Sequence, residues 1–114
     1  MMELKSIQVN EKAADGKLYR AEEFTLGERY EVEVYDTTYE SGTAIRKIYV
    51  EAVDRNDRYL PVIYYQTAIF GESEPRFKIQ TTAYGAMDIE DIQKAIAGYQ
   101  EAIEAVKVLT EAFC

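Results

Sequence analysis

The sequence predicts an α+β domain: an antiparallel β-sheet of five or six strands with one C-terminal amphipathic helix packed on one face. Two patterns predict it. Residues 3 to 83 divide into short segments of alternating or β-branched character, separated by turn-forming residues. Residues 88 to 113 instead repeat apolar residues every three or four positions, which is the period of a helix. Because 114 residues enclose only one hydrophobic core, 1–114 is expected to be a single α+β domain.

The strands are predicted from side-chain alternation. In the clearest of them, Tyr30, Val32 and Val34 alternate with more polar residues, as in a strand with one buried face. Asp15 and Gly16 form a hairpin-type turn signal between the first two strands. The other strands are expected at residues 4–11, 18–26, 43–53, 59–70 and 76–83, with Pro61 placing the early part of its strand at an edge or a bulge.

The helix has boundaries that the sequence defines well. Asp88 can cap it and Asp91 occupies the third helical position. Gly98 costs about 1 kcal/mol relative to Ala inside a helix, so it either marks a close approach to a strand or is simply tolerated. One apolar stripe is expected to pack on the sheet: Ile89, Ile92, Ile96, Tyr99, Ile103, Val106, Leu109 and Phe113.

Composition excludes several kinds of chemistry. The chain has no histidine, which removes the usual zinc sites and every His-based acid/base pair. Residues 54–58 lack the glycine and the terminal glutamate of a calcium-binding loop. No phosphate-binding glycine loop or nucleophile motif is present either. We therefore expect no catalytic residues, no metal and no cofactor, and a protein that is not an enzyme.

Location and partners follow from charge and cysteine content. The only cysteine, Cys114, cannot form an internal disulfide, and no signal-peptide-like run begins the chain, so a cytoplasmic location is expected. The longest apolar runs, such as 60–65, are too short to span a membrane. The net charge of −8 argues against direct binding to nucleic acid and favours a basic protein as partner.

Acidic residues are concentrated between positions 22 and 40, where seven acids accompany one arginine. In a strand, Glu31 and Glu33 project to the same side about 6.8 Å apart, which is close to the spacing of phosphates along an extended nucleic acid. The segment is thus a candidate nucleic-acid mimic, although a solvated strand face has the same composition. The candidate partner-binding residues are Glu22, Glu23, Glu28, Glu31, Glu33, Tyr35, Asp36, Tyr39 and Glu40.

Ten tyrosines and no tryptophan are the second unusual feature. Tyrosine combines a large apolar ring with one polar group, which suits binding surfaces, but strand propensity also explains its abundance. Tyr64 and Tyr65 are adjacent, so one of them is expected to face outward. Stacking of nucleic-acid bases on such rings is a further alternative, for which the usual basic groove is missing.

The segments 81–92 and 102–106 resemble the ends of small proteins of phages and mobile elements. The short, acidic profile with a sheet followed by a helix is similar to that of anti-CRISPR proteins. This resemblance implies a stoichiometric inhibitor that occupies a basic nucleic-acid channel of a CRISPR effector nuclease. The alternatives are a structural or self-assembling subunit of a phage or mobile element, and a small enzyme. The oligomeric state is not predicted.

Overall fold

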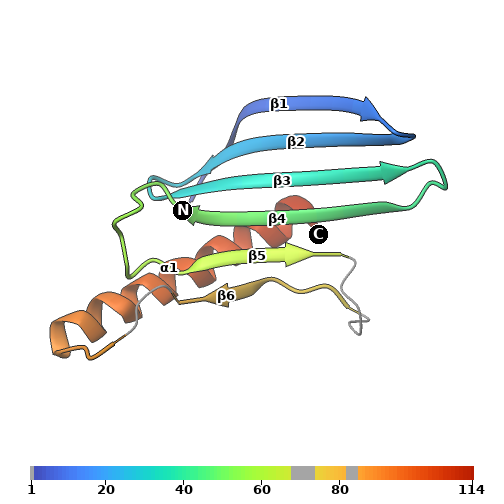
Figure 1. The fold of residues 1–114 in the computed structure, drawn as a ribbon. Coiled ribbons are helices and arrows are strands. Elements are labelled where there is room, and N and C mark those ends of the chain that lie inside the picture. The colour runs from blue at the N-terminus through green and yellow to red at the C-terminus, as the bar shows by residue number, and fades with distance from the viewer. Residues whose placement is uncertain (1, 68–73, 82–84) are drawn as a thin grey trace.

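The computed structural model has two layers, a six-stranded antiparallel sheet and one helix that crosses one of its faces (Figure 1). The structure describes residues 2–67, 74–81 and 85–114. The elements are β1 (Leu4–Ala14), β2 (Lys17–Leu26), β3 (Tyr30–Tyr39), β4 (Ala44–Ala52), β5 (Val62–Gln66), β6 (Lys78–Gln80) and α1 (Ile89–Phe113). The predicted fold class is therefore confirmed.

The strands pair in the order of the sequence, each antiparallel to the next. The first connection is the predicted tight hairpin, with Asp15 and Gly16 both at positive φ, 52° and 72°. This combination matches the twist of paired strands and is easiest for glycine and for short polar residues. Pro61 immediately precedes β5, so its missing N–H removes no hydrogen bond from the sheet. The ends of the two strands predicted at 59–70 and 76–83 lie partly outside the described residues.

The hydrophobic core lies between α1 and one face of the sheet. In β3, Tyr30, Val32 and Val34 are buried, as the alternation predicts. Ile48 and Val50 of β4 lie opposite Val34 and Val32 and continue the same buried face. The helix contributes Ala102, Ala105 and Leu109, all fully buried. Among the described residues, no helix covers the opposite face of the sheet, which is toward the viewer in Figure 1.

The start of α1 is as predicted. The Asp88 side chain accepts a hydrogen bond from the backbone amide of Asp91 at 2.9 Å. The Asp91 carboxylate in turn accepts from the backbone amide of Asp88, which completes a capping box. The carboxylates also lie at the positive end of the helix dipole, so both effects fix the beginning of the helix.

The face that the helix turns to the sheet differs from the predicted one. The buried helical residues are small: Ala95, Gly98, Ala102 and Ala105, with Leu109 near the end. Leu109 is buried, and Val106 and Phe113 are partly buried against the core, as expected. The expectation was wrong for the rest of the stripe, which is exposed from 38% at Tyr99 to 75% at Ile89: Ile89, Ile92, Ile96, Tyr99 and Ile103.

Gly98 explains why the helix packs on the sheet through its small residues. A Cβ atom at this position would overlap the carbonyl oxygen of Tyr59 and lie 2.9 Å from the Tyr59 carbonyl carbon. The helix therefore approaches the segment before β5 more closely than any larger side chain permits. Of the two explanations for Gly98, close approach is the one that the structure supports.

The helix of the described residues, α1, lacks the apolar length that a membrane crossing requires.

Candidate protein-binding surface

The nine candidate residues do not share one surface. Because side chains alternate along a strand, Glu23, Glu31, Glu33, Tyr35 and Tyr39 project from the open face, away from α1. Glu22 and Asp36 project from the helix side. Glu28 lies in the β2–β3 turn and Glu40 in the β3–β4 turn. The stretch 22–40 thus divides between two faces and two turns.

The two helix-side acids are neutralised within the protein. Glu22 accepts a hydrogen bond from Ser6 at 2.7 Å and pairs with Arg20 at 3.2 Å. Asp36 accepts two hydrogen bonds from the Arg46 guanidinium, at 2.6 and 3.0 Å. The hydrogen bond to Asp36 is also the main cause that raises the pKa of Arg46. These carboxylates already have basic partners and offer little free charge to another protein.

The open-face acids have a different environment, because tyrosines surround them. Glu23 of β2 lies opposite Glu33 of β3, which lies opposite Tyr49 of β4, which lies opposite Tyr64 of β5. Directly opposite residues have Cβ atoms about 5 Å apart, so these side chains form one continuous line across four strands. Together with the neighbouring open-face residues, they define the outer-face cluster: Glu23, Glu31, Glu33, Tyr35, Tyr49, Glu51 and Tyr64.

Like charges oppose one another twice in this cluster. Glu31 lies opposite Glu51, and Arg55 bridges the two, at 3.7 Å from Glu31 and in direct contact with Glu51. Glu23 lies opposite Glu33, and within the described residues no cation pairs with either. Like charges directly opposite are destabilising, so this uncompensated pair costs the protein stability. A basic group from outside would relieve it.

Tyr35 reports the local negative charge. Its hydroxyl donates a hydrogen bond to Glu33, the largest of the causes that raise the pKa of Tyr35 to about 12. Burial adds to the shift, followed by the charges of Glu33, Glu23 and Glu51. Three carboxylates from three strands therefore act on one hydroxyl. Lys47, opposite Tyr35 on β4, lies diagonally from Glu33 at the edge of the cluster.

Three members of the cluster were not among the sequence candidates: Tyr49, Glu51 and Tyr64. The signal for Tyr49 and Glu51 was present, since they alternate with buried Ile48 and Val50. Tyr64 is the outward member of the adjacent pair, while Tyr65 turns inward against Phe77, with ring centroids 4.8 Å apart. The expectation that one of the two faces outward is confirmed. Their alignment with Glu33 depends on strand register, which the sequence does not contain.

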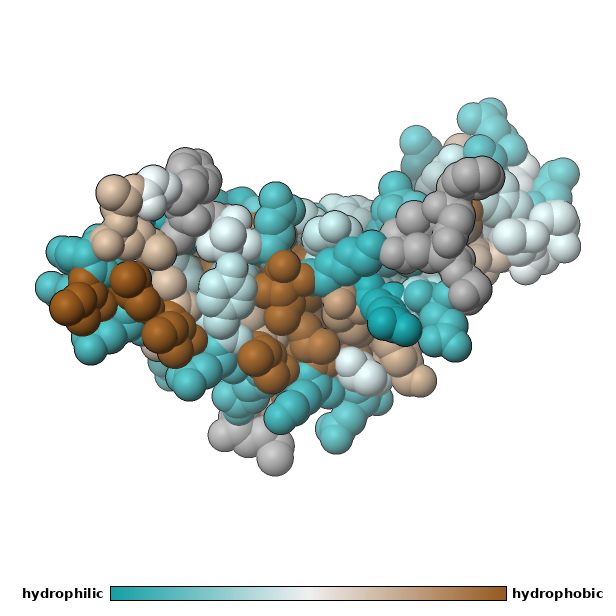
Figure 2. Space-filling model, turned by 90° about the horizontal axis from the view of Figure 1, so that it is seen from below, coloured by the Kyte–Doolittle hydropathy of each residue, from teal (hydrophilic) through white to brown (hydrophobic). Residues whose placement is uncertain are grey.

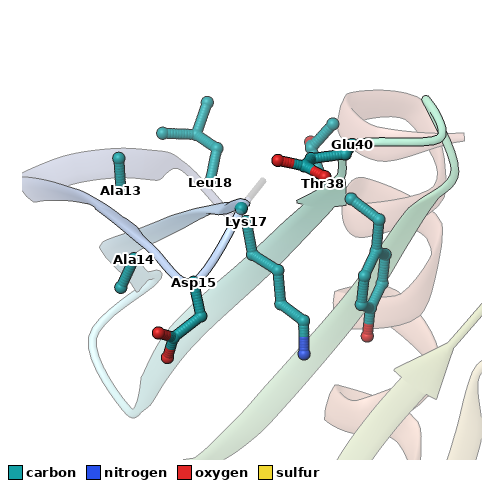
Figure 3. Close-up of a pocket in the computed structure, with 9 residues that line it drawn as sticks. Ala13, Ala14, Asp15, Lys17, Leu18, Thr38 and Glu40 are labelled. Atoms are coloured by element: carbon teal, nitrogen blue, oxygen red, sulfur yellow. The ribbon is translucent and has the colours of Figure 1, made fainter.

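A hollow lies at the tip of the β1–β2 hairpin (Figure 3). The Lys17 ammonium group lies 5.0 Å from the ring centroid of Tyr39, opposite it on β3. The carboxylates of Asp15 and Glu40 point in different directions from this lysine in Figure 3. The charged groups therefore do not converge on a common point. Among the described residues, no three acidic or cysteine side chains gather closely enough to hold a metal ion.

Comparisons with protein-family models, with curated proteins and with solved structures find no match for this chain.

Proposed function

We propose that this chain is a non-catalytic protein-binding inhibitor whose outer-face cluster binds a basic segment of another protein. The opposed carboxylates of Glu23 and Glu33 carry this proposal, because they remain without a cation in the described structure and lie on an open sheet face. Tyr35, Tyr49 and Tyr64 beside them are each about two-fifths exposed and offer rings to the stem of an arginine.

The binding chemistry favours arginine-rich partners. A planar guanidinium can hydrogen-bond two carboxylate oxygens and stack on a neighbouring tyrosine ring at the same time. The outer-face cluster shares four residues with the mimic suggested by the sequence and leaves out its other five candidates: the shared ones are Glu23, Glu31, Glu33 and Tyr35. A nucleic-acid channel of a CRISPR effector nuclease is the partner that the resemblance implies, and that identity rests on the resemblance alone.

The first test uses an eight-residue oligoarginine peptide as the probe and maps its contacts by NMR. We expect amide shifts at residues 23, 33, 35 and 49, and an affinity that falls as salt rises. Replacement of Glu23 and Glu33 by Lys should weaken binding at least tenfold. Glu104→Lys plus Glu111→Lys is the matched control: it changes the charge equally at exposed helical positions and should weaken binding far less.

The second test uses a guide-loaded Cas9-type nuclease and measures DNA cleavage with increasing amounts of this protein. Inhibition at about one equivalent, lost in the Glu23→Lys plus Glu33→Lys variant, is the expected result. Oligoarginine binding without inhibition would support the outer-face cluster as a surface for basic partners and would reject the CRISPR effector as the partner. Peptide contacts on the helix, or equal binding by both double variants, would reject the outer-face cluster itself.

A further inference from the structure

The exposed apolar stripe of α1 has no partner within the described structure. Ile89, Ile92, Ile96, Tyr99 and Ile103 lie along one side of the helix, and 38 to 75% of each residue is exposed. Figure 2, a view from the β6 edge, shows the corresponding row of apolar side chains along the helix with polar residues on both sides. Contiguous exposed apolar rows of this kind mark interaction surfaces.

The spacing of the stripe is that of a helix that pairs with another helix. Its members, continued by partly buried Val106, follow one another at intervals of three, four, three, four and three residues. This is the 3.5-residue repeat of a coiled-coil seam, which stays in contact with a second helix. The seam extends from Ile89 to Val106, about 26 Å at 1.5 Å per residue.

The order of the intervals identifies the second helix. Three-four-three-four-three reads the same in both directions, so the seam matches its own antiparallel copy. Ile89 then faces Val106 of the second copy, Ile92 faces Ile103, and Ile96 faces Tyr99. A two-fold symmetric dimer needs a self-complementary surface of this kind. We propose that two copies of this chain associate through an antiparallel pair of α1 helices.

Charge favours the antiparallel arrangement over the parallel one. Directly beside the seam, the only charged residues are Asp88 at its beginning and Lys107 at its end. Lys107 is exposed and makes no ion pair within the described residues. The antiparallel pair brings Lys107 of one copy to the level of the acidic first turn of the other. A parallel pair would align lysine with lysine, acid with acid, and the two helix dipoles with each other.

The sheets leave room for this pairing. The helical residues that pack on the sheet lie about 110° around the helix axis from the seam at 100° per residue: Ala95, Gly98, Ala102, Ala105 and Leu109. Each sheet is therefore set back from the contact between the helices. The outer-face cluster lies on the other side of the sheet and stays free, so the dimer does not depend on the proposed function.

The interface is small. Two helices in contact over about 26 Å bury an area at the low end of the range for specific complexes, so we expect a dissociation constant in the micromolar range. Sedimentation equilibrium from about 1 μM to 1 mM should therefore show a monomer converting to a dimer. A monomer throughout this range would overturn the proposal.

Substitutions then test the seam. Ile96→Glu plus Ile103→Glu should make the dimer undetectable, at least a hundredfold weaker, while circular dichroism and thermal unfolding show that the monomer remains folded. Ala97→Glu plus Ala112→Glu adds the same charge at exposed helical positions outside the seam and should leave the dimer unchanged. A dimer that survives the first pair of substitutions, or is lost equally with the second, would place the contact elsewhere.

Cross-linking gives an independent readout that also fixes the direction of the helices. In a Cys114→Ser background, a mixture of Ile96→Cys and Tyr99→Cys proteins should form the mixed disulfide faster than either protein forms one alone. Faster cross-linking of each variant with itself would indicate parallel helices and reject the proposed arrangement. Binding of a monomeric protein to vesicles containing anionic phosphatidylglycerol, without any mixed disulfide, would assign the stripe to a lipid surface instead.

Discussion

The Tyr30 hydroxyl donates a hydrogen bond to the carbonyl oxygen of Pro61 at 2.8 Å, inside the core. Tyr30 and Pro61 are both fully buried, so the only polar group of this ring is satisfied by the segment that leads into β5. The same segment contains the Tyr59 carbonyl against which Gly98 packs. The segment 59–61 therefore leads into β5 and also contacts both β3 and α1.

Replacement of Tyr30 by Phe should lower the free energy of unfolding by about 1 to 3 kcal/mol. The Pro61 carbonyl would lose its partner where water cannot replace it, which costs more than an exposed hydrogen bond does. Urea unfolding followed by circular dichroism measures the loss. Tyr64→Phe is the control, since Tyr64 lies on the open face, and it should change stability by less than about 0.5 kcal/mol. Equal losses in the two variants would contradict this role of the bond.

Stability should also fall at alkaline pH. Burial, reinforced by the negative charge of Glu101, raises the pKa of Tyr30 well above the ordinary value of about 10. The folded state therefore keeps a proton that the unfolded chain loses, so the stabilisation is complete below about pH 10 and declines as pH rises beyond it. Urea unfolding between pH 8 and 11 should show a steeper decline for the wild type than for Tyr30→Phe. Parallel declines would show that Tyr30 is not responsible.

Local patterns predicted much of this fold. Alternation in β3 identified Tyr30, Val32 and Val34 as buried, Asp15 and Gly16 marked the hairpin, and Asp88 marked the helix start. Each depends on residues only a few positions apart, so each is readable without knowledge of the partner strand.

The packed face of α1 was not predictable in the same way. Hydrophobicity ranks isoleucine above alanine and glycine, and so it selected Ile96 in preference to Gly98 for the buried side. What decides the face is how closely the helix approaches Tyr59, a contact between segments almost forty residues apart. The outer-face cluster has the same difficulty, because the alignment of Glu33 with Tyr49 and the bridge from Arg55 to Glu31 both depend on the register between β3 and β4.

Replacement of Gly98 by Ala should destabilise the protein, although Ala is the better helix former by about 1 kcal/mol. The added methyl group would meet the Tyr59 carbonyl and push the helix from the sheet, so we expect a net loss of about 1 to 3 kcal/mol. Ala97→Gly, at the exposed neighbouring position, should lose about 1 kcal/mol from helix propensity alone. A Gly98→Ala protein more stable than the wild type would show that the approach is not close.

Arg29 joins a turn, a loop and the helix through hydrogen bonds of 2.5 Å to Asp57 and to Glu101. Burial acts to raise the pKa of Asp57, but hydrogen bonds from Arg29 and the backbone outweigh it and the pKa is lowered. Asp57 therefore stabilises the fold above about pH 4, and its contribution is lost as pH falls below that value.

Replacement of Arg29 by Gln should accordingly lower the free energy of unfolding by about 1 kcal/mol or less at pH 7, since the guanidinium is partly exposed. The difference from the wild type should shrink as pH falls below 4, because protonation of Asp57 removes the charge that pairs with Arg29. Thermal unfolding at pH 7 and pH 3 provides the comparison. Arg76→Gln, which removes a largely exposed pair with Glu74, should have no measurable effect at either pH. A difference that persisted unchanged at pH 3 would mean that the Asp57 charge plays no part.

Replacement of Glu33 by Gln should lower the pKa of Tyr35 from about 12 toward the ordinary value near 10. The hydrogen bond from Tyr35 to a carboxylate holds the phenolic proton, and the negative charge nearby opposes formation of a phenolate. Glutamine removes the negative charge but keeps an oxygen that can accept the hydrogen bond from Tyr35. A lowered pKa of Tyr35 therefore reports the loss of charge and not the loss of the contact. NMR titration of the Tyr35 ring carbons measures the pKa directly. Glu28→Gln, in the β2–β3 turn, should leave the Tyr35 pKa unchanged, and an equal shift in both variants would mean that overall charge, rather than the outer-face cluster, controls it.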